Sequence, residues 1–287
     1  MEIAVISGKG GTGKSSICAA FVTIAQKAMA VDCDVDASNL YLLFSPTKDQ
    51  EHVFISGYQA VIDSQYCTNC GLCLEYCRFD AIILRDEKVQ ISETSCEGCF
   101  LCSRICPSRA IKMVPADKSR FYVGSFRYGK MVYGYLAPGE ENSGKLVSQI
   151  RNKAHEEARK NDYDTLIIDG PPGIGCSAIS TITGVDRVVV VTEPSLSAFH
   201  DLQRIIIVVR QFSLPIFVII NKFDLNLTMS MQIERWCQDE NIPVVAHLPF
   251  DIEVVKAMVA EKTIVEYQPD HKIVKLLQSA YYQIIKN

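Results

Sequence analysis

The sequence predicts an α/β fold with a mainly parallel sheet and a small α+β segment inserted into it. Three observations lead to this prediction. Short apolar runs alternate with stretches of helical length along most of the 287 residues. A glycine-rich segment joins the first apolar run to the first helix. A stretch with eight of the twelve cysteines interrupts the alternation. Continuous apolar strands separated by helices imply a sheet that helices cover on both faces.

The first part of the alternation starts at the N-terminus. Ile3–Ser7 predicts a short buried strand, and Lys14–Lys27 predicts the helix that follows the glycine-rich loop. Met29–Cys33 predicts a second strand, and the acidic residues Asp34 and Asp36 follow it. Polar side chains at the end of a buried strand are typical of a ligand site at the edge of a parallel sheet.

The alternation resumes after the cysteine-rich stretch. Further strands are expected at Thr165–Asp169, Val188–Thr192, Pro215–Ile220 and Val244–Leu248. Helices are expected at Gly144–Lys160, Ser197–Phe212 and Ser230–Glu240, and two more near the C-terminus. We therefore expect one discontinuous α/β domain, residues 1–56 and 117–287, and one inserted domain, residues 57–116.

Composition excludes several classes of protein. A net charge of −4 argues against nucleic acid as an obligate partner. The longest aliphatic runs, Ile205–Val209 and Ile216–Ile220, are far too short for a membrane span, so we expect no membrane association. The first strand leads directly into the glycine-rich loop, and we expect no signal peptide. Twelve cysteines without such a signal favour metal ligation in a reducing cytoplasm over disulfides.

The glycine-rich segment has the full phosphate-loop pattern, Gly8-x4-Gly13-Lys14-Ser15, between a strand and a helix. Its backbone N–H groups and the helix N-terminus predict a site for the phosphates of a nucleotide. Lys14 is expected to reach the β- and γ-phosphates, and the Ser15 hydroxyl to bind Mg²⁺. The other residues expected to contact the nucleotide here are Gly8, Gly10, Gly11, Thr12, Gly13 and Ser16.

A second lysine, Lys9, stands at the front of this loop, and Gly-Lys-Gly-Gly resembles the deviant Walker A motif of the MinD, ParA, Mrp and nitrogenase iron-protein families. Asp32–Leu40 resembles the switch I segment of MinD and Mrp proteins, and Leu166–Gly173 resembles their Walker B and switch II segment. Leu248–Asp251, followed by Val254–Ala257, is similar to their base-packing loop. The resemblance spans nearly the whole chain outside the insert and implies a P-loop NTPase fold of the SIMIBI type.

The resemblance also implies roles for four residues. Lys9 would reach across a homodimer to the nucleotide of the partner chain, and Lys14 would bind the nucleotide of its own chain. Asp34 would position the attacking water, and Asp169 would hold the Mg²⁺ shell. These roles are physically reasonable, because cations offset the charge that develops on phosphoryl oxygens and carboxylates orient water and metal.

The base contact has two interpretations. Asn221-Lys222-Phe223-Asp224 fits the pattern with which GTPases select guanine. In MinD-like families, the corresponding asparagine contacts adenine, and the loop with Pro249 and Asp251 packs on the base. The rest of the chain favours the second interpretation, and hence ATP over GTP.

The cysteines form two runs of the same spacing, Cys-x2-Cys-x2-Cys-x3-Cys, and each position of the first run recurs 29 positions later. This duplication is the pattern of bacterial two-cluster ferredoxins, in which the last cysteine of each run binds the other cluster. The pattern implies a ferredoxin-like insert with two [4Fe–4S] clusters. Eight cysteines in this spacing exceed what one tetrahedral zinc site needs. The expected ligand sets are Cys67, Cys70, Cys73 and Cys106 for one cluster, and Cys77, Cys96, Cys99 and Cys102 for the other.

Four cysteines remain. Cys18, Cys33 and Cys237 stand among apolar residues and are expected in the core. Cys176 follows Asp169 by seven positions, a spacing that resembles a cluster ligand of the nitrogenase iron protein. We favour a small residue packed in the switch loop and keep an intersubunit ligand as the alternative. The apolar stripe of the last helix, which includes Ile273, Leu276 and Ile285, is expected to dock on the core rather than on a membrane.

Together these features predict an ATPase that dimerises around two nucleotides and couples this switch to its clusters. The output would be electron transfer to a redox partner, or assembly and delivery of a metal–sulfur centre to an acceptor apo-protein. The alternative is a ferredoxin-type carrier whose nucleotide site only regulates docking. A positioning switch like MinD and ParA is a third hypothesis, and it leaves the eight cluster ligands without a role.

Overall fold

The computed structural model describes residues 1–286, and the chain divides into two compact units. The first unit holds Met1–Glu51, Tyr122–Tyr135 and the chain from Ser143 onward, and the second holds His52–Phe121 and Leu136–Asn142. The division falls inside strands β3 (Gln50–Phe54) and β8 (Ser119–Phe126). The second unit is longer than the predicted insert at both ends, and the domain boundaries stay a prediction.

In the described chain, nine strands form one sheet in the order β13-β12-β11-β1-β10-β2-β9-β8-β3. Neighbouring strands from β13 to β9 all pair in parallel. The strands not yet located are β1 (Glu2–Ser7), β2 (Ala28–Asp32), β9 (Gly129–Tyr135), β10 (Thr165–Pro172), β11 (Arg187–Thr192), β12 (Ile216–Asn221) and β13 (Val244–Leu248). The predicted mainly parallel sheet is confirmed.

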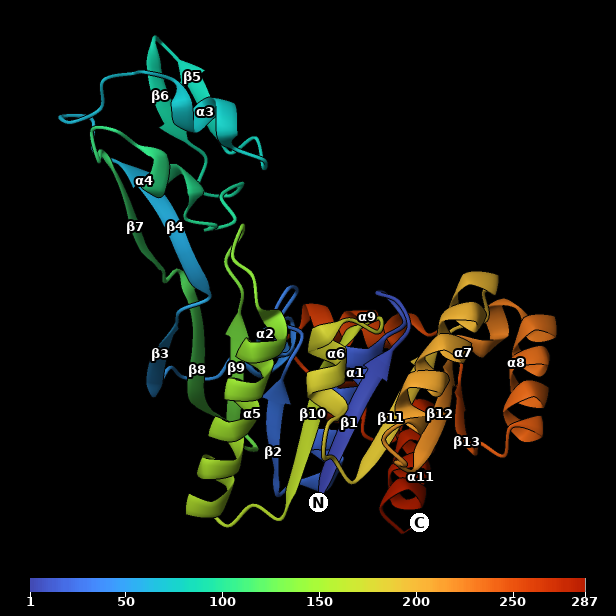
Figure 1. Cartoon of the computed structure of the whole chain (residues 1–287). Coiled ribbons are helices and arrows are strands. Elements are labelled where there is room, and N and C mark those ends of the chain that lie inside the picture. The colour runs from blue at the N-terminus through green and yellow to red at the C-terminus, as the bar shows by residue number, and fades with distance from the viewer. Residues whose placement is uncertain (287) are drawn as a thin grey trace. The chain divides into compact units, whose positions relative to one another are not determined.

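Helices cover both faces of this sheet (Figure 1). They are α1 (Lys14–Ala25), α2 (Leu40–Phe44), α5 (Ser143–Lys160), α6 (Cys176–Ile182), α7 (Leu196–Arg210), α8 (Leu227–Asp239), α9 (Ile252–Val259), α10 (Ile264–Tyr267) and α11 (Lys272–Lys286), with a 3₁₀ turn η1 (Phe223–Leu225). Ile3 and Val5 of β1 pack with α1 and α11, and the alternate residues Ala4 and Ile6 are also fully buried. Because successive side chains of a strand face opposite sides, both faces are covered.

Strands β3, β8 and β9 were not predicted from the sequence. The stretch around β8 and β9 is rich in tyrosine and glycine and lacks the aliphatic runs that predicted the other strands. Gly124 in β8 permits a close approach, since a Cβ there would meet the carbonyl oxygen of Thr47. None of the helices within residues 1–286 has the length and apolar character that a membrane crossing requires.

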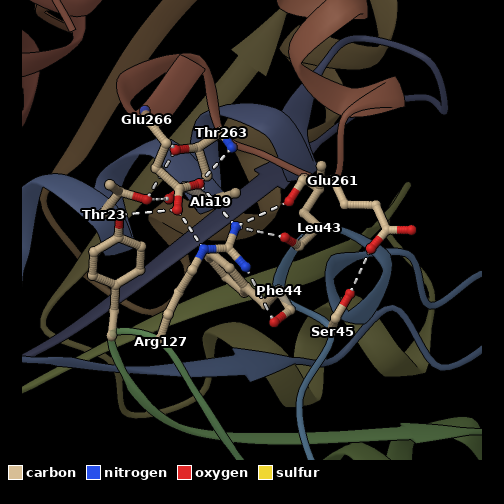
Figure 2. Close-up of polar contacts among 10 residues, drawn as sticks. Ala19, Thr23, Leu43, Phe44, Ser45, Arg127, Glu261, Thr263 and Glu266 are labelled. Atoms are coloured by element: carbon tan, nitrogen blue, oxygen red, sulfur yellow. Dashed lines mark hydrogen bonds and ion pairs between the residues drawn. The ribbon is translucent and has the colours of Figure 1, made fainter. Parts of the chain in front are cut away.

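Arg127, between β8 and β9, joins three segments of the first unit (Figure 2). Its guanidinium donates to the carbonyl oxygens of Leu43 (2.7 Å) and Phe44 (3.2 Å), which end α2. It also pairs with both carboxylate oxygens of Glu266 in α10. Glu266 in turn accepts from the backbone N–H of Thr263, which closes the capping box of α10. Arg127 therefore satisfies helix-end carbonyls that would otherwise lack donors.

The second unit contains two antiparallel pairs of strands and two short helices. Strand β4 (Gly57–Ile62) pairs with β7 (Ile111–Ala116), and β5 (Ile82–Arg85) pairs with β6 (Lys88–Ile91). In the first pair, Gly57 lies opposite Ala116. The helices are α3 (Leu72–Tyr76) and α4 (Leu101–Ile105).

The sequence repeat of this unit is also a repeat of its backbone. The bounds of α3 and α4 differ by the same 29 positions as the cysteines. The Asp63 N–H donates to the Ala110 carbonyl (2.8 Å), and the Ser92 N–H donates to the Ala81 carbonyl (2.7 Å), so the two halves exchange equivalent bonds. Left-handed backbone conformations recur at the equivalent pairs Asn69 and Gly98, Gly71 and Phe100, and Asp80 and Arg109.

Candidate nucleotide site and cysteine cavities

A pocket of about 690 Å³ lies in the first unit at the carboxyl ends of the parallel strands. This is the edge where α/β sheets bind ligands, and the volume suits a nucleotide-sized molecule. Most of the residues predicted to contact a nucleotide line it: Gly10, Gly11, Thr12, Gly13, Lys14, Ser15, Ser16, Asp34, Asn221, Lys222, Pro249 and Asp251. Gly8, Lys9 and Asp169 are predicted site residues outside this lining.

The phosphate loop turns tightly into α1. Gly11 (φ 81°) and Gly13 (φ 88°) are left-handed, a conformation that glycine adopts at little cost. A Cβ at Gly13 would also meet the amide nitrogen of Asn221. No side chain caps the start of α1 at Gly13, so the first N–H groups of the helix are available to an anion.

Lys14 lies buried beneath this loop. Its Nζ is 2.7 Å from Asp169 Oδ1, 3.3 Å from Asp34 Oδ2 and 3.4 Å from Ser15 Oγ. Burial alone would lower the pKa of Lys14, but the charges of Asp169 and Asp34 outweigh burial and raise it well above its usual range. Lys14 therefore stays an ammonium at any physiological pH.

The other oxygens of these two carboxylates have no partner. Asp34 Oδ1, Asp169 Oδ2 and the hydroxyl of Thr12 are buried without a hydrogen bond in the described chain. Buried polar atoms are costly unless paired, and carboxylate and hydroxyl oxygens are the ligands of Mg²⁺. The residues present thus fit a Mg²⁺ ion, held directly or through its waters by Asp34, Asp169 and the nearby Ser15.

The carboxylate of Asp32 stabilises this arrangement through hydrogen bonds to the segment that follows β2. It lies opposite Asp169 in the β2–β10 pair and is fully buried. Its carboxylate accepts from Ser38 Oγ (2.7 Å) and from the N–H groups of Asp34 (3.0 Å) and Leu40 (3.1 Å). Burial, followed by the charge of Asp169, raises the pKa of Asp32 to about 7. Asp32 therefore fixes the backbone turn that presents Asp34.

The predicted base-contact residues Asn221, Lys222, Pro249 and Asp251 all line this pocket. The Asn221 amide donates to the Thr12 carbonyl (2.8 Å) and accepts from the Lys222 N–H (3.0 Å). Asp251 lines the pocket and also caps α9 by accepting from the Glu253 N–H (3.1 Å). Asp224, which a guanine site would require, is absent from the described lining and accepts from the Phe250 N–H (2.7 Å).

Lys9 contacts residues of its own chain. Its Nζ lies 2.7 Å from Glu193 Oε1, and the second oxygen of Glu193 lies 3.0 Å from Lys222 Nζ. Burial opposes ionisation of Glu193, but these two lysines outweigh it and lower the pKa of the carboxyl. Glu193 was not among the site residues predicted from the sequence. Its signal was a carboxylate directly after the predicted strand Val188–Thr192, at the same sheet edge as Asp34 and Asp169.

In the second unit, the two predicted ligand sets line two separate cavities. Cys67, Cys70, Cys73 and Cys106 line one. Cys77, Cys96, Cys99 and Cys102 line the other, and Cys73 also reaches it. Within residues 1–286, no three His, Cys, Asp or Glu side chains converge on a point that would hold a single metal ion. Thiolates spread around a cavity are the donor set of a multi-iron cluster.

Backbone donors also point at these sulfurs. The N–H of Ala110 lies 3.3 Å from Cys106 Sγ, and the N–H of Ala60 lies 3.4 Å from Cys96 Sγ. Hydrogen bonds to cysteine sulfur stabilise cluster-bound thiolates and set their potential. The chemistry of the cysteines and of these donors fits [4Fe–4S] clusters, and the clusters themselves and the assignment of each ligand stay predictions.

The remaining cysteines separate into two groups. Cys18, Cys33 and Cys237 are fully buried, as predicted. Cys176 is exposed at the start of α6, so the favoured prediction of a packed residue was wrong. Ser177 and Ala178 of the same turn are buried, and Cys176 lies on its exposed side. The last helix docks on the core through Ile273, Val274, Leu277, Ala280, Tyr281 and Ile284, whereas Leu276 is exposed.

Known proteins share this sequence pattern and fold. The profile of the CobQ/CobB/MinD/ParA nucleotide binding domain matches residues 3–264. An uncharacterized protein of Methanocaldococcus jannaschii is 34% identical over 91% of this chain and 88% of its own length. Hydrogenase-4 component A of Escherichia coli is 38% identical over 41% of this chain and 60% of its own length. The Mg-ADP complex of MinD from Pyrococcus horikoshii superimposes with a TM-score of 0.61 at 19% identity, over 99% of this chain and 96% of that one.

Proposed function

Because the chain belongs to the CobQ/CobB/MinD/ParA nucleotide-binding family, we propose that it is a Mg²⁺-dependent ATPase whose nucleotide-driven pairing of two chains is coupled to two [4Fe–4S] clusters. The output is electron transfer or the assembly and delivery of a metal–sulfur centre. One observation carries this proposal. The same chain combines a phosphate loop above a Lys14–Asp34–Asp169 cluster with two cysteine-lined cavities, which Cys73 lines in common.

The nucleotide half of the proposal assigns each polar group a task. Lys14 exchanges its carboxylate partners for the β- and γ-phosphates, and the loop N–H groups hold the phosphates in place. Asp34 and Asp169 would hold Mg²⁺ and the attacking water with the oxygens that have no protein partner, and the Ser15 hydroxyl would complete the Mg²⁺ site. ATP is favoured over GTP, because Asp224 is engaged with the Phe250 backbone and does not line the pocket.

The cysteine half of the proposal rests on the donor sets and on one relative. Two [4Fe–4S] clusters supply one-electron chemistry when bound. The similarity to a hydrogenase component supports a redox role for part of the chain, since hydrogenases exchange electrons. The same eight cysteines would serve electron transfer and cluster delivery equally well.

A second candidate is a ferredoxin-type carrier whose nucleotide site only regulates docking. The proximity of Lys9 to Glu193 within one chain is compatible with this candidate, because a lysine held in this way contributes nothing to hydrolysis in the single chain. Negligible ATP turnover by a chain that binds Mg-ATP would favour it. A positioning switch is the least supported function, since it leaves the cysteines unused.

An anaerobic redox titration followed by EPR tests the proposal. The cluster potentials are measured with and without Mg²⁺ and a non-hydrolysable ATP analogue. A shift of about 60 mV would correspond to about 1.4 kcal/mol of coupling for one electron and would support ATP-gated electron transfer. Unshifted potentials with both clusters present would favour delivery or a docking switch. Absence of iron after anaerobic reconstitution would refute the cluster half of the proposal.

A further inference from the structure

The ammonium group of Lys9 is fully hydrogen-bonded within its own chain. Its Nζ has three acceptors, which are Glu193 Oε1 at 2.7 Å, Ser195 Oγ at 3.1 Å and Ser197 Oγ at 3.3 Å. A lysine ammonium has three donors, so these contacts use all of them. Any other acceptor, including a phosphate oxygen, must replace at least one of these three.

Glu193 is the acceptor on which this arrangement depends. The two serines lie at the start of α7, where Ser195 is the N-cap and accepts from the Ala198 N–H. A helix N-terminus carries partial positive charge and repels a cation. Among the three acceptors only Glu193 is charged, so its carboxylate outweighs this repulsion and keeps Lys9 beside α7.

The same carboxylate also holds a second lysine. Glu193 Oε2 lies 3.0 Å from Lys222 Nζ, which donates to the carbonyl of Gly11 as well (2.8 Å). Each oxygen of Glu193 therefore serves one lysine, and Lys9 has the shorter contact. The three side chains are partly buried, which shields the ion pairs from solvent more than at an open surface.

We propose that Glu193 is a positioning residue that retains Lys9 within its own chain and thereby opposes the ATP-dependent pairing of two chains. This inference rests on the proposed function, in which Lys9 reaches the nucleotide of the partner. Lys9 cannot contact both Glu193 and a phosphate of the partner with the same donor. Breaking the Lys9–Glu193 ion pair costs free energy. This cost makes ATP-dependent dimerisation less favourable by the same amount.

The test measures the dimer dissociation constant of the full chain by sedimentation under anaerobic conditions. Wild type and Glu193→Gln are compared in Mg-ATP and in Mg-ADP. Glutamine keeps the shape of the side chain and removes its charge. We expect Glu193→Gln to dimerise about tenfold more tightly in Mg-ATP, equivalent to about 1.4 kcal/mol, and to be unchanged in Mg-ADP. A merely structural role for Glu193 would affect both nucleotides alike.

Two variant backgrounds identify the residue through which Glu193 acts. In a Lys9→Ala background, Glu193→Gln should have no further effect on the dissociation constant, because the retained lysine is absent. In a Lys222→Ala background, the tenfold effect should persist. Ser197→Ala is the matched control, since it removes a neutral acceptor of Lys9 and should change the constant by less than Glu193→Gln does.

Three results would overturn the inference. If Glu193→Gln changed the dimer dissociation constant equally with and without Lys9, Glu193 would act through a residue other than Lys9. Dissociation constants that match between wild type and Glu193→Gln, in a wild type that does dimerise with Mg-ATP, would refute the retention of Lys9 and leave the proposed function intact. A wild type that binds Mg-ATP and stays monomeric at every concentration would refute the dimer switch itself and this inference with it.

Discussion

Asp34 and Asp169 each use one oxygen for Lys14 and leave the other without a partner. Two such oxygens beside a phosphate loop favour a divalent cation over a structural ion pair, because a structural pair gains by satisfying all of its acceptors. Lys14 would remain bonded to Asp34 if Asp169 lost its charge. The contributions of the cation and of the lysine can therefore be separated by experiment.

Asp169→Asn is expected to weaken Mg-ATP binding about 10- to 100-fold, the range found when a carboxylate that supports a metal is replaced. Binding of ATP in the presence of EDTA should change much less, since Lys14 and the loop N–H groups remain. Titration of a fluorescent ATP analogue with and without Mg²⁺ measures both. An equal loss under the two conditions would show that Asp169 acts through Lys14 or through folding.

Gly13→Ala and Gly10→Ala form a matched pair in the same loop. Alanine at position 13 would adopt φ 88° and would meet the Asn221 amide, whereas a Cβ at Gly10 has open space around it. We expect Gly13→Ala to cost about 1–2 kcal/mol and Gly10→Ala to leave stability nearly unchanged. Thermal unfolding followed by the fluorescence of Trp236, the one tryptophan, measures the difference. Equal melting temperatures would contradict this account of the loop.

Single residues were predictable where a short motif carries them. Lys14 and Ser15 were recognisable because the phosphate loop is contiguous in sequence. Glu193 was not, because its partners Lys9 and Lys222 lie 184 and 29 positions away and meet only when strands β1, β11 and β12 align. A carboxylate at the end of a predicted strand can be recognised in the sequence, but the lysines that pair with it cannot.

Elements with aliphatic runs were predicted to within a few residues. Val244–Leu248 was expected as a strand and is β13, and Lys14–Lys27 was expected as a helix that in fact ends at Ala25. Strands β8 and β9 were not predicted because their burial depends on aromatic packing, as in the stacked pair Tyr122 and Tyr133. Periodicity detects alternating aliphatic residues far better than it detects aromatic contacts.

The capping box of α10 makes the first unit sensitive to acid. Burial opposes ionisation of Glu266, but Arg127, the Thr263 N–H and Tyr128 together lower the pKa of Glu266 from 4.5 to about 2. A lowered pKa in the folded state stabilises the fold above pH 4.5, and this stabilisation is lost as pH falls towards 2. At neutral pH it amounts to at most about 3 kcal/mol.

Glu266→Gln should therefore destabilise the protein near pH 7 and have progressively less effect below pH 4.5. Urea unfolding at several pH values, followed by Trp236 fluorescence, gives the free-energy difference between wild type and variant. Because wild type and variant are compared at the same pH, the contributions of other acid-sensitive groups to the unfolding free energy cancel. A difference that stays constant down to pH 3 would show that Glu266 is not ionised in the network of Figure 2.

At the scale of the whole molecule, the duplicated cysteine runs allow two assignments of ligands to clusters. In the crosswise assignment Cys70 shares a cluster with Cys106, and in the run-by-run assignment it shares one with Cys77. The cavities group Cys70 with Cys106.

The fold class was predictable from the alternation of strands and helices and from the phosphate-loop motif. The division of the chain inside β3 and β8 was not predictable, because no change of composition marks it.

Two double variants distinguish these assignments by iron content. With crosswise binding, Cys70→Ser/Cys106→Ser damages one cluster and should keep about half of the iron of wild type. Cys70→Ser/Cys77→Ser damages both clusters and should lose most of the iron. Iron assay and EPR after anaerobic reconstitution measure the result. The reverse order would establish binding within each run.

The entry and exit of the cysteine-rich segment lie side by side. Gly57, where β4 begins, pairs with Ala116, where β7 ends, and the strands β3 and β8 that flank them are neighbours at the edge of the nine-stranded sheet. A segment whose two ends meet closes its own loop and leaves the order of the host strands unchanged. A single insertion between these two neighbouring strands would therefore add the cysteine module to a nucleotide-binding domain without rearranging the rest of its sheet.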